Sequence, residues 1–298
     1  MPINPDAVGT RSDPTESLWR SKDGLLYAVG VGAGQDPLSE TERPFFSENS
    51  IDTTQRILPT MVVTVPDVSG AFRAIGSFNP AMLVHGEERI VLHREVPVEG
   101  TVSTVAEITA VWDKGKGAVV EITSTSTLVG ETEPLFEVVM SAFIRGEGGW
   151  GGERGPSGPR HQAPDRDPDA VVTYPTRPEQ ALVYRLSGDR NPLHSDPGFA
   201  AMAGFDRPIL HGLCTYGFTG RALLHELCGS DPARFRSMEG RFSSPVMPGE
   251  DLTVQMWRTG DGAAVYRTLA SGDRVVLDSG AVTFDARALR RPTLPPNL

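Results

Sequence analysis

The sequence predicts an α+β fold built from two similar units, each a helix followed by an antiparallel β-sheet. Three observations support this fold class. A Gly- and Pro-rich segment divides the chain, apolar and polar residues alternate in both halves, and an apolar segment precedes each alternating region. A helix that packs on one face of an antiparallel sheet is an α+β arrangement.

Composition limits the class of protein before any motif is considered. The 298 residues are 39% apolar and 22% charged, which supplies enough apolar side chain for a folded core. The net charge of −10 has the wrong sign for a surface that binds nucleic-acid phosphates. No apolar run approaches the ~20 residues of a membrane span, and the first residues do not resemble a signal peptide. We therefore expect a soluble protein with no nucleic-acid partner and no membrane insertion.

Cys214 and Cys228 are the two cysteines of the chain. Two cysteines are too few for a disulfide framework, which favours a reducing compartment, and we expect a cytoplasmic location. No base lies at a spacing that would mark either as a nucleophile. We therefore interpret both as small buried apolar side chains.

The segment 146–168 consists mostly of Gly, Pro and charged residues and contains almost nothing to bury. We interpret this composition as a linker between two packed units. The division predicts a first unit at residues 1–148, a linker at 149–168 and a second unit at 169–298. Each unit is close to the common size of a domain.

Three short strings recur in the same order in the two halves, which predicts a duplicated unit. The strings of the first half begin at Tyr27, Ile57 and Val96, and those of the second half begin at Tyr184, Ile209 and Val246.

Alternation of apolar and polar residues predicts three antiparallel strands in each half, separated by Gly-containing turns. The predicted strands are 102–112, 118–128 and 135–144 in the first half, and 252–258, 264–269 and 275–284 in the second. A buried helix is predicted upstream of each set, at Leu213 to Leu227 and, from a weaker pattern, at Met61 to Ile75.

The polar loop from Tyr184 to Pro197 carries the strongest indication of chemistry. Asp189 and His194 lie five residues apart in it, so a carboxylate and an imidazole can share one water, with the Asn191 amide orienting either. Such a pair suits general acid–base catalysis. The alternative is that Asp189 or Asn191 caps the helix that follows. One Asp and one His give only two metal ligands, so we expect no metal.

A second indication is Gly212, which directly precedes the predicted apolar helix. Its N–H can point outward at the positive end of the helix dipole, where it would bind a developing oxyanion. His211 is either a second base or a packed, hydrogen-bonded side chain. The corresponding positions of the first half hold Asp36 in a loop without histidine, and Pro59-Thr60. We therefore expect one active site per chain, with the first unit serving as a cavity wall.

These residues resemble a known motif. The segment Tyr184 to His194, followed by Phe205 to Gly217, is similar to the hydratase 2 motif of the MaoC-like, (R)-specific enoyl-CoA hydratases. Strings of the first half also resemble the two-unit form that is fused into peroxisomal multifunctional enzyme type 2: Leu26 to Ala33, Val84 to Glu87 and Gly148 to Gly152. The resemblance implies a double hotdog fold, in which each unit is a long helix wrapped by an antiparallel sheet.

The resemblance also implies an activity, namely reversible hydration of trans-2-enoyl-CoA to (3R)-3-hydroxyacyl-CoA in fatty-acid or sterol side-chain β-oxidation. By resemblance, Asp189 and His194 are catalytic, Asn191 orients the site, and the Gly212 N–H binds the thioester oxygen. The implied substrate contacts are His85, Gly86, Lys114, Arg190, Pro192, Leu193 and Phe242.

The family requires no cofactor other than the CoA of its substrate, and we expect a homodimer. Two alternatives remain open. A hotdog acyl-CoA thioesterase would release free CoA, and a non-catalytic acyl-CoA-binding protein would need no intact Asp/His pair. The sequence does not identify the acyl group.

Overall fold

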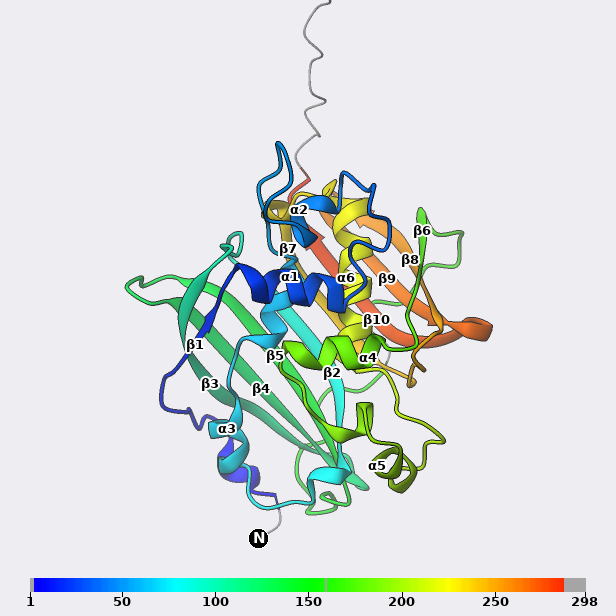
Figure 1. Cartoon of the computed structure of the whole chain (residues 1–298). Helices are drawn as coiled ribbons and strands as arrows, with labels where there is room; N and C mark the ends of the chain where they lie inside the picture. Colours follow the sequence, from blue (N-terminus) through cyan, green and yellow to red (C-terminus); the bar gives the residue numbers. More distant parts are fainter. Residues whose placement is uncertain (1–2, 159, 287–298) are drawn as a thin grey trace, which may run out of the picture.

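A continuous antiparallel β-sheet of ten strands spans both units in the computed structural model, which describes residues 3–158 and 160–286 (Figure 1). The strands of the first unit are, in sheet order, β1 (Thr15–Trp19), β3 (Gly100–Asp113), β4 (Gly117–Leu128), β5 (Pro134–Arg145) and β2 (Leu83–Leu92). The sheet continues into the second unit with β7 (Phe235–Phe242), β10 (Arg274–Phe284), β9 (Ala263–Ala270), β8 (Asp251–Gly260) and β6 (Ala170–Pro175).

The strand order is mirrored about the β2–β7 junction. Reading outward from that junction, the first unit runs β2-β5-β4-β3-β1 and the second runs β7-β10-β9-β8-β6, so each strand has a counterpart at the same depth in the sheet. The predicted duplication is confirmed. The six strands predicted from alternation are confirmed as well, because they coincide with β3, β4, β5, β8, β9 and β10.

The long helix α6 (Gly212–Cys228) confirms the helix predicted in the second unit. It packs against β7, β8 and β10 and also reaches the first unit, where it contacts the 3₁₀ helix Pro59–Thr64. Gly229 ends it in the left-handed conformation with a φ of 62°, which glycine adopts without strain. Among the described residues, no helix is long and apolar enough to cross a bilayer.

The remaining helices are short. They are α1 (Ser21–Gly30), α2 (Arg43–Phe46), α3 (Ser69–Ala74), α4 (Gln180–Tyr184) and α5 (Pro197–Met202). The helix predicted at Met61 to Ile75 is wrong as a single element, because that segment forms the 3₁₀ helix and α3 instead. Pro66 lies between the two pieces and has no N–H to continue a helix. Within residues 3–148, the first unit therefore has no long helix that corresponds to α6.

The two units share a core and several polar contacts. β2 pairs with β7 from Glu87 to Val91. The rings of Tyr27 and Tyr184 meet edge to face with centroids 6.1 Å apart, and one apolar cluster contains side chains of both units. The buried Arg221 of α6 forms an ion pair with Glu42 of the first unit. The first unit thus supplies the second with a paired strand, part of its apolar core and the partner of a buried cation.

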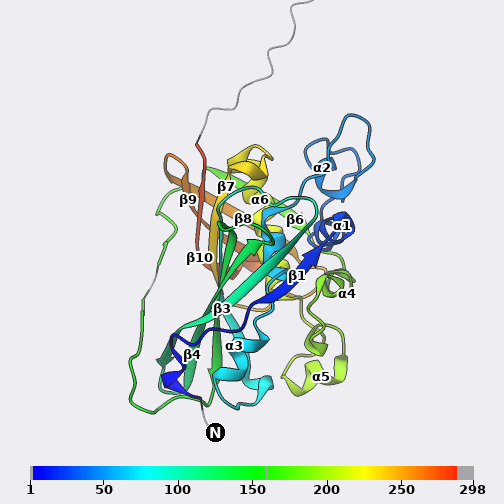
Figure 2. The same cartoon turned by 90° about the vertical axis from the view of Figure 1, so that its left-hand side faces the viewer.

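The segment between the units contains no helix or strand among its described residues, and hydrogen bonds hold it against the sheet. Figure 2 shows it on the side of the sheet away from α1 and α4. Asp113 accepts hydrogen bonds from the backbone N–H groups of Gly115, Gly149 and Gly151 at 2.7–2.8 Å. The indole N–H of Trp257 donates to the carbonyl of Arg166 at 2.9 Å.

Candidate active site

The polar loop before α5 is built from local hydrogen bonds. The Asp189 carboxylate accepts from the N–H of Asn191, and the Asn191 side chain accepts from the N–H of Leu193, both at 3.0 Å. Asn191 thereby caps the short 3₁₀ turn Pro192–His194. The alternative in which Asp189 or Asn191 caps the following helix is wrong for α5, whose cap is Asp196. These bonds fix the loop that carries the candidate residues.

His194 is held as a neutral base. Its Nδ1 lies 2.9 Å from the carbonyl oxygen of Ile209, so Nδ1–H donates and the lone pair resides on Nε2. Burial lowers the pKa of His194, an effect that the Ile209 carbonyl and Asp189 partly oppose. The imidazole is therefore neutral near pH 7, with Nε2 able to accept a proton.

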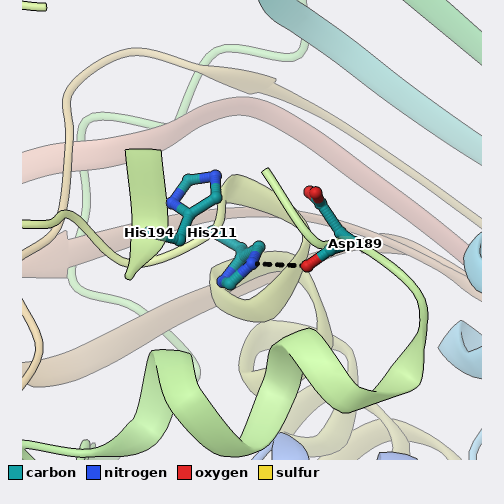
Figure 3. A group of neighbouring side chains, drawn as sticks. All are labelled: Asp189, His194 and His211. Carbon is teal, nitrogen blue, oxygen red and sulfur yellow. Dashed lines mark hydrogen bonds between the residues drawn. The ribbon is translucent and has the colours of Figure 1, made fainter. Parts of the chain in front are cut away.

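His211 lies directly against His194. The two imidazoles stack with centroids 3.7 Å apart, and His211 Nε2 lies 3.2 Å from the backbone carbonyl oxygen of Asp189 (Figure 3). Burial lowers the pKa of His211 to about 4, and the neighbouring His194 contributes to the shift. His211 is thus a packed, hydrogen-bonded residue that also contacts the backbone of the loop at Asp189.

Asp189, His194 and His211 converge, and their candidate metal-ligand atoms lie within 4.8 Å of one another. We expected only two candidate metal ligands here, one Asp and one His, but the fold brings His211 beside them as a third. Each imidazole uses one nitrogen on a main-chain carbonyl. The exposed Asp189 carboxylate and the buried His194 form the expected carboxylate–imidazole pair.

Gly212 is the first residue of α6, where the helix leaves its N–H without an intrahelical partner. A Cβ at this position would lie 3.2 Å from the ring of Phe242, so the close approach favours glycine. Phe242 in turn meets the edge of the His85 ring, with centroids 5.0 Å apart. Two predicted substrate contacts, His85 and Phe242, therefore lie beside the predicted oxyanion donor.

The other predicted contacts are distributed over two regions. Gly86 lies on β2 next to His85, whereas Arg190, Pro192 and Leu193 lie on the loop that carries Asp189 and His194. Lys114 lies on the β3–β4 hairpin, where its ammonium donates to the carbonyl oxygens of Arg154 and Pro156, the latter at 2.9 Å. Lys114 is thus engaged by the linker, and its role toward CoA stays a prediction.

Sequence reasoning missed two buried residues near the site. Glu88 is 2% exposed and lies 2.8 Å from His85 Nε2. The signal was a carboxylate on the apolar face that Ile90 and Leu92 share in β2. Tyr184 is buried too, and its ring lies 5.0 Å from that of His211. Its local sequence gave no sign of this contact, because His211 lies much farther along the chain.

The chain matches known families over most of its length. Residues 160–276 match the family described as the MaoC-like domain, and residues 18–146 match the family described as the MFE-2 hydratase 2 N-terminal domain. The chain is 46% identical over 294 residues to 3-hydroxyacyl-thioester dehydratase Y of Mycobacterium tuberculosis, covering 96% of this chain and 100% of that protein. The chain belongs to the MaoC-like hydratase 2 family.

Other members agree with this assignment. Enoyl-CoA hydratase ChsH3 of the same bacterium is 42% identical, with 94% of this chain and 98% of that protein covered. The crystal structure of a MaoC-like dehydratase from Phytophthora capsici superposes with a TM-score of 0.85 at 33% identity, covering 97% of this chain and all of that chain. The MaoC-like hydratase 2 fold is a hotdog fold.

The two-unit arrangement is also known. A Mycobacterium tuberculosis protein described as a double hotdog is similar with a TM-score of 0.57 at 14% identity, covering 93% of this chain and 96% of that one. At that identity the likeness concerns the fold alone. The double hotdog fold implied by the motif is confirmed, with the difference that the first unit carries a 3₁₀ helix and α3 in place of a long helix.

Proposed function

We propose that this hydro-lyase adds water reversibly to trans-2-enoyl-CoA and yields (3R)-3-hydroxyacyl-CoA. The observation that carries the proposal is the convergence of Asp189 and neutral His194 with His211, the residue directly before Gly212, whose N–H at the start of α6 has no intrahelical partner. The names of similar proteins, a 3-hydroxyacyl-thioester dehydratase and an enoyl-CoA hydratase, support the same reaction class.

In this mechanism, one water lies between the Asp189 carboxylate and His194 Nε2. These two groups remove a proton from the water as its oxygen bonds to C3, and a proton is returned to C2. The net addition consumes one water and releases nothing. Proton transfer by positioned groups contributes about 10²–10⁴ in rate.

Negative charge develops on the thioester oxygen when the water oxygen attacks C3. The Gly212 N–H is our candidate for binding this oxygen, and such a donor contributes ~3–4 kcal/mol to the transition state. Asn191 holds the loop that carries both catalytic groups. No step requires a metal or a cofactor beyond the CoA of the substrate.

We further propose that the first unit accommodates the acyl chain, that its boundary with the second lies in residues 149–168, and that the chain forms a homodimer in the cytoplasm. The two buried, unpaired thiols of Cys214 and Cys228 support a reducing compartment. Size-exclusion chromatography with light scattering measures the oligomeric state.

The direct test incubates the protein with crotonyl-CoA and follows loss of the ultraviolet absorbance of the conjugated thioester, with chiral analysis of the product. We expect (3R)-3-hydroxybutyryl-CoA. A thiol-reactive dye in a parallel reaction detects free CoA, which a thioesterase would release. Release of CoA without a hydroxyacyl product, or no turnover at all, would contradict the proposed hydratase activity.

A further inference from the structure

A second His–carboxylate pair lies outside the catalytic loop, on β2 of the first unit. Glu88 is 2% exposed, and its carboxylate oxygen Oε2 lies 2.8 Å from His85 Nε2. The His85 side chain is 24% exposed. Burying a carboxyl group costs desolvation free energy, and a partly exposed histidine is its hydrogen-bond partner here. This arrangement needs an explanation.

The pair exists because β2 is irregular at Gly86. In a regular strand, residues three apart project to opposite faces of the sheet. The pairing of β2 with β5 shifts register between His85 and Glu87, which is the signature of a β-bulge. The bulge turns the His85 side chain to the inner face, where Glu88 lies. A Cβ at Gly86 would lie 3.2 Å from the carbonyl oxygen of Ser141, which favours glycine at the bulge.

Burial determines where the protons of this pair reside. Burial raises the pKa of Glu88, with His85 opposing the shift. A protonated Glu88 carboxyl donates its hydrogen to His85 Nε2, and the hydrogen of the imidazole then resides on Nδ1.

The exposed part of His85 borders the active site. Its ring makes a T-shaped contact with that of Phe242, and Phe242 packs against Gly212, the proposed donor to the thioester oxygen. Because Glu88 occupies Nε2, Nδ1 is the nitrogen left for a ligand. The Glu88–His85 pair therefore presents a hydrogen-bond donor on the wall of the first unit that faces the start of α6.

We propose that Glu88 is a positioning residue for substrate binding: it holds His85 so that Nδ1–H donates to a carbonyl oxygen of the acyl-CoA next to the reacting thioester. The inference rests on the proposed acyl-CoA substrate but not on turnover, because it concerns binding. Loss of Glu88 leaves His85 free to rotate and to change tautomer. The hydrogen bond from His85 to the acyl-CoA is then formed only part of the time, which weakens binding about tenfold.

The test compares Glu88→Leu with Glu88→Gln. The leucine variant removes the partner of His85, whereas the glutamine amide can still donate to Nε2 as a protonated carboxyl does. Glu137→Leu is the matched control, because Glu137 pairs with His93 at 3.3 Å on the exposed surface. All three are checked for folding by thermal unfolding.

Two measurements are made: the Kd of butyryl-CoA, which is saturated and does not react, by calorimetry, and KM and kcat for crotonyl-CoA. We expect Glu88→Leu to raise Kd and KM about tenfold while kcat changes less than threefold, and Glu88→Gln and the control to stay near wild type. Unchanged Kd in Glu88→Leu, or a loss in Glu88→Gln equal to that of the leucine variant, would overturn the proposal. Butyryl-CoA binding without crotonyl-CoA turnover in wild type would instead contradict the proposed hydratase reaction alone.

Discussion

At the scale of single residues, the protonation of His194 determines the pH range of the proposed reaction. A general base must be neutral, and burial lowers the pKa of His194 from its usual value of about 6.5. The base therefore stays mostly neutral as the pH falls to 6.5 and becomes protonated only at lower pH. We expect kcat/KM to be flat from pH 8 to about 6.5 and to fall at lower pH. A decline that begins above about pH 7.5 in the pH profile would contradict this assignment.

Removal of either catalytic group tests whether Asp189 and His194 act on one water. We expect Asp189→Asn and His194→Gln each to lower kcat by about 10²–10⁴ with little change in thermal stability. Because both groups serve the same water, the double variant should be little worse than either single one. Steady-state kinetics of the three variants decide the point, and losses that multiply would mean that the residues serve separate steps.

A proline at position 212 would remove the backbone N–H of Gly212 without interrupting the helix. Proline is tolerated at the first position of a helix, and the preceding His211 already has an extended ψ of 136°, as a residue before proline requires. We expect Gly212→Pro to lower kcat by about 10²–10³ with α6 intact by circular dichroism. Gly212→Ala is the control for the added Cβ, which meets Phe242, and it should retain more activity. Equal kcat in wild type and the proline variant would remove Gly212 from the mechanism.

The sequence was sufficient to predict those candidate site residues that lie close together along the chain. Asp189, Asn191 and His194 lie in one loop, so their proximity follows from the chain itself. His211 reaches the same loop only because the irregular segment between α5 and α6 brings it there, and no local pattern encodes that contact. Glu88 was hidden for a similar reason, since its partner shares its face only through the bulge at Gly86.

At the scale of elements, the β3–β4 hairpin is joined to the linker by one carboxylate. Hydrogen bonds from Gly149, Gly115 and Gly151 lower the pKa of Asp113 to about 2. A lowered carboxyl pKa stabilises the fold above the unfolded value of about 4. That stabilisation is lost as the pH falls toward 2.

We expect Asp113→Asn to lower Tm by a few degrees at pH 7 and to accelerate proteolysis of the linker. The difference in Tm from wild type should shrink between pH 4 and pH 2, because the wild-type carboxylate becomes protonated there. Thermal unfolding across this pH range measures it. A difference that is independent of pH would mean that the carboxylate charge is irrelevant to the linker.

Element prediction succeeded where the period of the pattern was regular. β3 and β4 alternate between inner and outer faces over most of their lengths, and the α6 segment is apolar and uninterrupted. The prediction of one helix at Met61 to Ile75 was wrong because it followed the apolar content of the segment and neglected the helix break at Pro66. The junction strands β2 and β7 were not predicted, since a bulge and charged side chains obscure their alternation.

At the scale of the molecule, the second unit depends on the first for partners that it lacks. β7 pairs with β2, and the guanidinium of Arg221 pairs with Glu42. A fragment of residues 166–298 would expose the edge of β7 and leave a buried cation without its acid. We expect that fragment to be insoluble or self-associating when expressed alone. A stable, soluble monomer in size-exclusion chromatography would contradict this dependence.

The same asymmetry determines the number of sites. The duplication was evident from three ordered strings, yet only the second unit carries Asp189 and His194. Calorimetric titration with an unreactive acyl-CoA should therefore give one site per chain. Two equivalent sites would mean that the first unit retains a complete binding site.

Because the two units lie in one chain, their sequences are not required to stay identical, as the subunits of a homodimer are. In a homodimer, each substitution enters both copies at once, because a two-fold interface repeats every contact. The mirrored strand order preserves the geometry of such a dimer, while Asp36 and Thr60 stand where the second unit has Asn191 and Gly212. A substitution in the first unit would thus change the proposed cavity wall and leave the loop of Asp189 and His194 intact. Substitutions in the first unit can therefore change the substrate range, while turnover depends on residues of the second unit.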